Sequence, residues 1–345
     1  MTERTGFSGT SRIVITFAAL IIVVAGLKYS ASLIVPFLLS AFIAVIFSPI
    51  MDFFRKKKLP VILALLLIMF IILFVLSAFG GLVATSVNSF SDNIPLYEEK
   101  INALIASLIH SLQNIGFDLS ETKLNELLNS ASIMTFVTGL LSGLGNALTN
   151  SLIVLFTVIF MLLESTSFPQ KIQKIVEDNK HKPFALDNFT KSVKDYLWIK
   201  TIISFITGVI VTIALLLFGV DYPLLWGTLA FLLNYIPTIG SFIAAVPAVL
   251  LTIIQIGPIT SLFVALVYVG VNTIMGNIVE PKYMGKELGL STLVVFLSLI
   301  FWGWVFGPVG MLLSVPLTMI LKIGFENSKD TKWIAVLLGS ENQYE

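Results

Sequence analysis

The chain contains no cysteine, and only two of its 345 residues are histidines. The absence of cysteine excludes disulfides, thiol catalysis and thiolate metal sites. Charged residues are scarce at 12%, whereas 57% of the residues are hydrophobic, and this balance excludes an ordinary soluble domain. The net charge of +1 gives no reason to expect a nucleic-acid partner. The composition therefore predicts an all-α, polytopic membrane protein.

The motifs of two common enzyme classes are also missing. The sequence has no H-E-x-x-H and no G-x-x-x-x-G-K-[ST], so metalloproteases and P-loop ATPases are excluded. The two histidines, His110 and His181, fall in polar segments, which argues against histidine-dependent catalysis within a membrane. We therefore expect no enzyme activity, no cofactor and no metal site.

Apolar segments of about 20 residues predict the membrane-spanning helices. Five to six full spans are expected, at residues 13–27, 33–50, 61–84, 146–163, 201–218 and 258–276. The basic cluster at residues 55–58 lies between the second and third spans, and the positive-inside rule places it in the cytoplasm. This assignment puts the N-terminus in the cytoplasm as well, and the basic residues near the C-terminus favour the same side.

The alternation of polar and apolar segments divides the chain into six parts. They are N-terminal membrane helices (1–87), external amphipathic helices (88–131), a membrane helix (132–164), cytoplasmic interfacial helices (165–200), a transport core with two hairpins (201–323) and a cytoplasmic tail (324–345). In the external part, Ile101, Ile105 and Ile109 fall on one helical face. This pattern favours packing on the membrane surface or on a neighbouring subunit over a ligand-binding domain.

The most informative feature is an uncharged stretch from Tyr222 to Val279 that is interrupted by helix-breaking residues. A second apolar block, residues 290–321, repeats the pattern. The breakers are Pro237, Gly240 and Pro247 in the first block, and Gly307, Pro308, Gly310 and Pro316 in the second. Backbone that leaves the helix within hydrocarbon persists only where other protein or water satisfies its polar groups. Paired broken segments therefore predict a translocation site.

Each broken block can form either a re-entrant hairpin or a kinked complete crossing. The positions of the basic residues that follow favour two hairpins that enter from opposite faces. The blocks also resemble each other, since each has a proline and a glycine near its turn. This similarity is consistent with an inverted repeat, and chance is the alternative because both residues are frequent in membrane helices.

The polar side chains near the breaks are mostly neutral. They are Asn234, Tyr235, Thr238, Ser241, Asn272 and Asn277. Such groups suit a neutral or hydroxylated solute, with hydrogen bonding between helices as the alternative for each. Glu280, beside Pro281 in an expected loop, is either a solvated or salt-bridged carboxylate or a site that binds and releases a proton or sodium ion.

Three motifs resemble the autoinducer-2 exporter family of bacterial membrane proteins. They are residues 234–240 (NYIPTIG), residues 276–281 (GNIVEP) with the later Met284 and Gly285, and residues 307–310 (GPVG) with residues 315–317 (VPL). The run 290–295 (LSTLVV), followed by 301–304 (FWGW), looks particularly like the branch that contains the autoinducer-2 transport protein. The resemblance covers essentially the whole chain.

The resemblance implies export of autoinducer-2, a small polar quorum-sensing signal, across the bacterial inner membrane. It also implies a homo-oligomer, a pentamer, whose protomers move the substrate past two helical hairpins by an elevator-like motion, with membrane lipid as the surrounding partner. Some relatives are described as sodium or lithium/proton antiporters, and many carry an acidic residue near Met275 that this chain lacks. The lack of a deep carboxylate favours the neutral solute. The antiporter and an oligomeric scaffold are the alternatives.

Overall fold

The computed structural model describes residues 9–114, 135, 138–139, 151–165, 184–237, 239–284, 289–326 and 331–340. Throughout these residues the regular elements are helices, which confirms the predicted all-α class. Five helices in this part of the chain are long and apolar enough to cross a membrane, and shorter apolar helices accompany them. The polytopic class is thus confirmed, although one of the five is residues 292–312 of the second broken block, and the predicted spans 13–27 and 146–163 correspond to shorter apolar helices.

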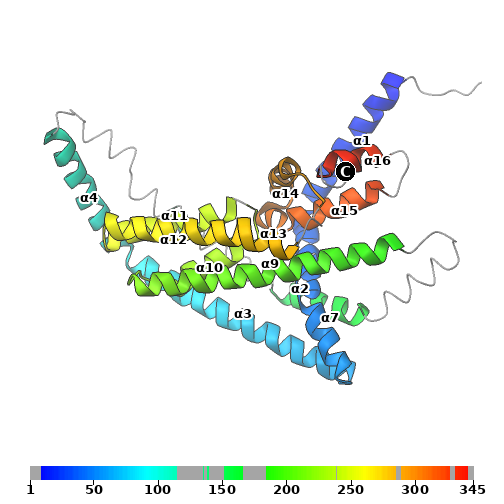
Figure 1. The fold of residues 1–345 in the computed structure, drawn as a ribbon, viewed down its shortest axis with the longest axis horizontal. Helices are drawn as coiled ribbons and strands as arrows, with labels where there is room; N and C mark the ends of the chain where they lie inside the picture. The colour runs from blue at the N-terminus through cyan, green and yellow to red at the C-terminus, as the bar shows by residue number, and fades with distance from the viewer. Residues whose placement is uncertain are drawn as a thin grey trace, which may run out of the picture. The chain divides into compact units, whose positions relative to one another are not determined.

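The described residues form two compact units. The central unit is Ala44–Gly289, and the terminal unit combines Met1–Ile43 with Leu290–Glu345. The terminal unit holds α1 (Gly9–Tyr29), the first part of α2 (Ala31–Lys56), α14 (Thr292–Leu312), α15 (Ser314–Glu326) and α16 (Lys332–Leu338). The central unit holds the rest of α2, α3 (Val61–Asp92), α4 (Ile94–Asn114), α7 (Ser151–Glu164), α9 (Phe184–Leu217), α10 (Pro223–Leu233), α11 (Ile239–Gln255), α12 (Pro258–Ile274), the π-helix η1 (Met275–Val279) and α13 (Glu280–Met284) (Figure 1).

The core of the central unit surrounds Trp226, whose side chain is fully buried. The indole Nε1 donates a hydrogen bond to the carbonyl oxygen of Asp221 at 2.9 Å, so the polar atom of the ring is satisfied. The ring of Phe90 on α3 meets the indole edge-on, at 6.4 Å between ring centroids. Edge-on contacts are a preferred arrangement of aromatic pairs. The contact fixes the end of α3 against the beginning of α10.

Helix α4 packs into the same core. Its side chains Ile101, Ile105 and Ile109 are buried in one cluster with Ala244 and Ala248 of α11. The apolar periodicity of this face favours the membrane surface or a neighbouring subunit as its partner. That prediction was wrong for the described helix, because periodicity shows that a face is buried but not what covers it.

The segment before α10 is held by α3 and α4. Tyr222 adopts a left-handed backbone conformation with φ of 56°, and Pro223 then begins the helix. Asn93 Nδ2 donates to the hydroxyl of Tyr222 at 2.9 Å, and the hydroxyl of Tyr97 donates to the carboxylate of Asp221 at 3.0 Å. Burial is the first of several causes that raise the pKa of Tyr97, so this phenol remains a donor.

In the terminal unit, α14 packs against α1 and the first part of α2. Trp302, Val305 and Phe306 form a buried cluster that Leu27 and Ile34 cover. The ammonium of Lys28 lies 3.7 Å from the ring centroid of Trp304, a cation–π distance. These contacts fix α14, the helix that contains the break of the second block.

Candidate functional site

Helix α9 carries a buried polar face. It runs for 34 residues without a break, through the boundary at residue 200 where the sequence predicts a change from interfacial helix to span. Tyr196, Lys200 and Ser204 lie four residues apart, so they follow one side of the helix, and all three are buried. Thr207 continues this face one turn later. A polar row inside an apolar helix indicates a partner that is also polar.

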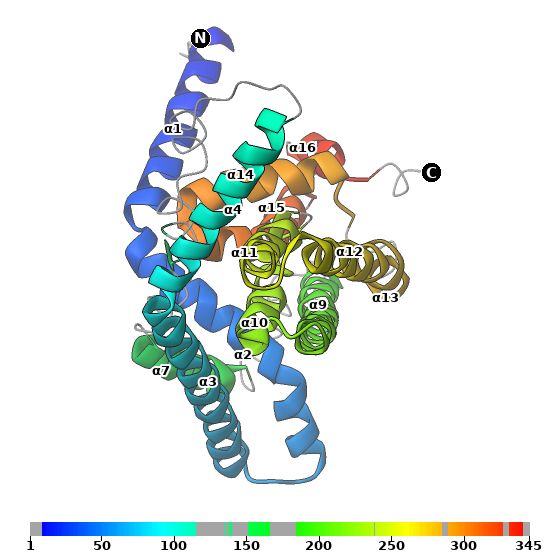
Figure 2. The ribbon, with the colours of Figure 1, turned by 90° about the vertical axis from the view of Figure 1, so that its left-hand side faces the viewer.

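The first broken block is that partner. Helices α10 and α11 are joined by a short turn, as the sequence predicts for a hairpin, and α10 packs against α9 (Figure 2). The two helices cross at Gly208 and Gly227. A Cβ atom at Gly208 would lie 2.7 Å from the carbonyl oxygen of Gly227, so only glycine permits this approach. Small residues allow such close crossings in membrane proteins.

The crossing brings the turn between α10 and α11 onto the polar face of α9. Asn234 Nδ2 donates to the hydroxyl of Ser204 at 2.9 Å, and both side chains are buried. The hydroxyl of Tyr235 donates to the hydroxyl of Thr201 at 2.8 Å. Thr201 in turn donates to the carbonyl oxygen of Leu197. The turn is therefore docked on α9 through neutral hydrogen bonds.

The remaining predicted residues of this turn shape it. Gly240 is buried, and a Cβ atom there would lie 2.8 Å from the carbonyl carbon of Leu233. Pro237 and Ser241 are half-buried at the same turn. Thr238 lies outside the described residues. The close approach to Leu233 explains why the residue three positions after Pro237 is a glycine.

Glu280 also reaches α9. Its two carboxylate oxygens lie 2.8 and 2.7 Å from Nζ of Lys200, and the side chains of the lysine and the glutamate are 4% and 21% exposed. Tyr196, one turn earlier on α9, is also buried. The salt-bridged interpretation of Glu280 is therefore confirmed. The expected loop was wrong, because Glu280 and Pro281 begin the helix α13 directly after the π-helix η1.

The two asparagines predicted to line the path differ in exposure. Asn272 is half-buried near the end of α12, and Asn277 is exposed within η1. Among the residues that the structure describes, neither amide has a hydrogen-bond partner. Short π-helical segments within α-helices are frequent at functional sites. Both amides are therefore available to a ligand.

The second broken block folds back on itself in the terminal unit. Gly307 interrupts α14 with φ of 65° and ψ of −149°, a conformation that glycine adopts without strain. Pro308 follows it and is exposed. A Cβ atom at Gly310 would lie 2.7 Å from the carbonyl carbon of Trp302, which shows that the chain has reversed at the break.

Helix α15 covers this reversal. Trp302 Nε1 donates to the hydroxyl of Thr318 at 3.0 Å, and Pro316 is buried near the start of α15. The surroundings of Gly240 and Gly310 correspond. At each glycine, an added Cβ atom would meet a backbone carbonyl group and the Cβ atom of the residue four positions earlier. This local similarity is in keeping with the expected repeat.

The structure thus brings many of the predicted residues together in two groups, and Asn272, Asn277, Glu280 and Pro281 follow separately along α12, η1 and α13. Asn234, Tyr235, Pro237, Gly240 and Ser241 share the α10–α11 turn, while Gly307, Pro308, Gly310 and Pro316 shape the reversal in the terminal unit. Sequence reasoning missed the contributors from α9. They are Tyr196, Lys200, Thr201 and Ser204. The spacing of Tyr196, Lys200 and Ser204 just before an apolar run was a signal that could have found them.

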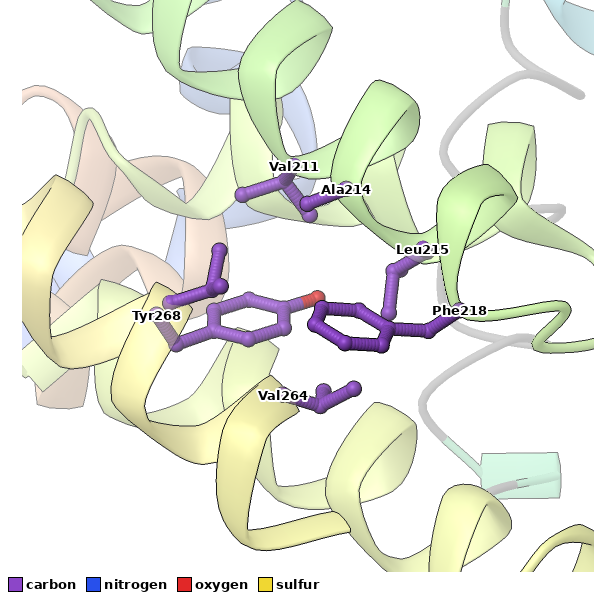
Figure 3. Close-up of a pocket in the computed structure, with 7 residues that line it drawn as sticks. Val211, Ala214, Leu215, Phe218, Val264 and Tyr268 are labelled. Atoms are coloured by element: carbon purple, nitrogen blue, oxygen red, sulfur yellow. The ribbon is translucent and has the colours of Figure 1, made fainter. Parts of the chain in front are cut away.

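A narrow apolar space lies elsewhere in the central unit, between α9 and α12 (Figure 3). It has an empty volume of about 150 Å³ and is too narrow to admit a water molecule. The hydroxyl of Tyr268 is buried there beside the ring of Phe218, and none of the described residues gives it a hydrogen-bond partner. A polar solute would find a single hydroxyl group there among apolar side chains, so this space does not extend the polar site.

Known proteins are similar to this chain over almost its whole length. Residues 17–330 match the model of the AI-2E family transporter. The chain is 41% identical to the AI-2 transport protein TqsA of Escherichia coli, over 96% of each chain. It is also 41% identical to a Haemophilus influenzae protein provisionally named a transport protein, over 97% of this chain and 98% of the relative. With its apolar spans and broken helices, the chain is a multi-pass membrane transport protein, not an enzyme, and it belongs to the AI-2E transporter family.

Proposed function

We propose that the protein exports autoinducer-2, a small polar signalling molecule, across the bacterial inner membrane by secondary transport. The docking of the α10–α11 turn on the polar face of α9 carries this proposal, because it concentrates neutral donors and acceptors among apolar helices. Neutral hydrogen-bonding groups of this kind fix the orientation of an uncharged polar ligand. The name of TqsA, an AI-2 transport protein, supports the choice of substrate.

In the proposed path, amides and hydroxyls bind the substrate, and glycine and proline shape the turns. The binding groups are Asn234, Tyr235, Thr238, Ser241, Asn272 and Asn277. The shaping residues are Pro237, Gly240, Pro281, Gly307, Pro308, Gly310 and Pro316. A neutral hydrogen bond contributes about 0.5–1.5 kcal/mol. The bonds that dock the turn are thus weak enough for substrate contacts to replace them during transport.

The same proposal extends to assembly and topology. The protein acts as a homo-oligomer, a pentamer, in which each protomer carries the substrate by an elevator-like motion. Both termini lie in the cytoplasm, and export serves quorum sensing. Cross-linking in native membranes and labelling of single cysteines, introduced into this cysteine-free chain, test these two points directly.

The sodium or lithium/proton antiporter is the alternative, and it needs Glu280 as the ion-binding carboxylate. Both oxygens of Glu280 contact Nζ of Lys200, and the positive charge of the ammonium balances the negative charge of the carboxylate. A cation would have to compete with this ammonium for the same oxygens. The pairing therefore favours the neutral substrate over the antiporter.

Replacing Asn277 with leucine tests the path. The change keeps the approximate size of the side chain and removes an amide that has no partner among the described residues, so membrane insertion and assembly should be unaffected. Uptake of labelled autoinducer-2 into inverted membrane vesicles should fall by about fivefold or more, because a polar group of the substrate is left without a partner, which costs about 1–3 kcal/mol. Asn114→Leu, at the exposed end of α4, is the matched control and should transport normally.

Two outcomes would contradict the proposal. Wild-type uptake by a well-assembled Asn277→Leu protein would remove Asn277 from the path. If wild-type vesicles take up no autoinducer-2 but show a sodium-driven pH change that depends on Glu280, the protein is an antiporter.

A further inference from the structure

We propose that Lys200 is a substrate-binding residue and that Glu280 is its resident counter-ion, which the substrate displaces. The inference rests on the proposed function as a carrier of a small polar solute, and it adds the charged group that the path would otherwise lack. Lys200 and Glu280 are 80 residues apart in the chain and meet only in the folded central unit.

The first argument is the cost of placing a lysine at this position. Its side chain is 4% exposed, within the 26-residue segment Ser192–Leu217 that is apolar enough to span a membrane. Charged groups in such segments are costly and mark substrate pathways and proton relays. A buried ion pair is often no more stabilising than an apolar pair of similar volume. Helix packing alone therefore gives no reason for Lys200 and Glu280 at this contact.

The second argument is the location of Lys200 beside the docked turn. Thr201, the next residue, accepts the hydrogen bond of Tyr235, and Ser204, one turn later, accepts that of Asn234. A ligand that takes the place of the turn on α9 therefore meets Lys200 together with both hydroxyls. The ammonium adds three donors to this set, and the hydroxyls can donate or accept.

The third argument is the asymmetry of the pair. Lys200 lies in the middle of a long helix and is 4% exposed, whereas Glu280 follows the π-helix η1, begins a helix of five residues and is 21% exposed. The partly exposed carboxylate can turn toward solvent by side-chain rotation, which needs no movement of the backbone. Glu280 is thus the partner that can leave, and Lys200 is the partner that stays in the site.

These groups define the class of ligand. An ammonium beside hydroxyl groups binds clustered oxygen atoms, such as those of a polyhydroxylated or carboxylated small molecule, and repels cations. Because Glu280 stabilises the ammonium in the absence of ligand, the site is neutral when empty. The oxygen atoms of the ligand must replace the carboxylate contacts, so ligands with adjacent oxygens are preferred over those with a single hydroxyl.

The test compares Lys200→Met, Glu280→Gln and the double variant Lys200→Met/Glu280→Met in inverted vesicles, with labelled autoinducer-2. Lys200→Met should raise KM by at least about tenfold, because a charge-assisted hydrogen bond is lost. Glu280→Gln should lower KM and also lower kcat, because the competing carboxylate is gone and release slows. The double variant should keep the high KM of Lys200→Met. Lys194→Met, on the same helix, is the matched control and should behave as wild type.

A merely structural ion pair gives a different pattern. Both single variants would then lose folded protein, and the double variant Lys200→Met/Glu280→Met would regain wild-type KM and stability; this result would overturn the inference. An unchanged KM in a well-folded Lys200→Met protein would overturn it as well. Size-exclusion profiles and thermal unfolding of each purified variant separate these cases.

A second measurement does not depend on the identity of the transported molecule. Ribose, lactate and autoinducer-2 are added to purified wild-type and Lys200→Met protein, and the shift in Tm is recorded. A shift with at least one of them that disappears in Lys200→Met supports the inference, even if wild-type vesicles fail to transport autoinducer-2 and the proposed function fails. Equal shifts in both proteins, or no shift with any of the three, would overturn it.

Discussion

Replacing Gly240 with alanine is expected to abolish transport and to destabilise the central unit by about 1–3 kcal/mol. The added Cβ atom would lie 2.8 Å from the carbonyl carbon of Leu233 and 2.9 Å from Cβ of Ile236. The first of these neighbours is backbone, which cannot rotate away as the end of a side chain can. The helices α10 and α11 must then separate at the turn, and the hydrogen bond from Asn234 to Ser204 is lost with the turn geometry.

The matched control is Gly270→Ala on α12, where an added Cβ atom would have no neighbour within 4 Å. Alanine has the higher helix propensity, so this variant should be at least as stable as wild type. Uptake in inverted vesicles and thermal unfolding of the purified proteins are compared for both. If Gly240→Ala transports and unfolds like Gly270→Ala, the tight turn is not needed for function.

The second large effect is expected for α4. Replacing Ile101 and Ile105 with alanine should destabilise the central unit by about 2–5 kcal/mol for each site, because each change leaves a cavity in the core shared with α11. Together these losses are comparable to the whole stability of many domains, about 5–15 kcal/mol. We therefore expect a protein that unfolds at a much lower temperature and is cleaved readily by protease.

Leu96→Ala is the control for this pair of changes, since Leu96 lies on the same helix and is exposed. Its Tm should stay within a few degrees of wild type. A double variant that unfolds at the wild-type temperature would show that α4 does not contribute to the core.

The role of α4 also affects the scaffold alternative. Deleting residues 95–130 would remove buried core side chains, so the loss of function would not distinguish a scaffold from a transporter.

The broken helices could be predicted from the sequence because glycine and proline act through local backbone rules. Pro237 with Gly240, and Pro308 with Gly307, predict the turn of α10–α11 and the reversal in α14. Thr238 lies outside the described residues, so its part in the first turn stays a prediction. These are the features of the candidate site that depend on neighbours in the chain.

The contacts of Lys200 could not be predicted in this way. The sequence places it at the end of a predicted cytoplasmic segment, whereas in the structure it is buried and α13 packs against its helix. Its partner Glu280 is distant in the chain, and no local rule selects that glutamate over Glu287. In the same way, the apolar face of α4 predicts burial, while its partner on α11 depends on tertiary packing.

The crossing of α9 and α10 at Gly208 and Gly227 sets a limit on how the first hairpin can move. The backbones of α9 and α10 are in close contact at this point, which holds α10 in place. The hydrogen bonds that Asn93 and Tyr97 donate to Tyr222 and Asp221 hold the segment before α10. The part of α10 after Gly227 and the turn that follows it are held on α9 mainly by hydrogen bonds such as that from Asn234 to Ser204, so this part can move most easily. If the proposed elevator-like motion holds, we expect opening to need only a small displacement of this turn, while α9 and α10 move together.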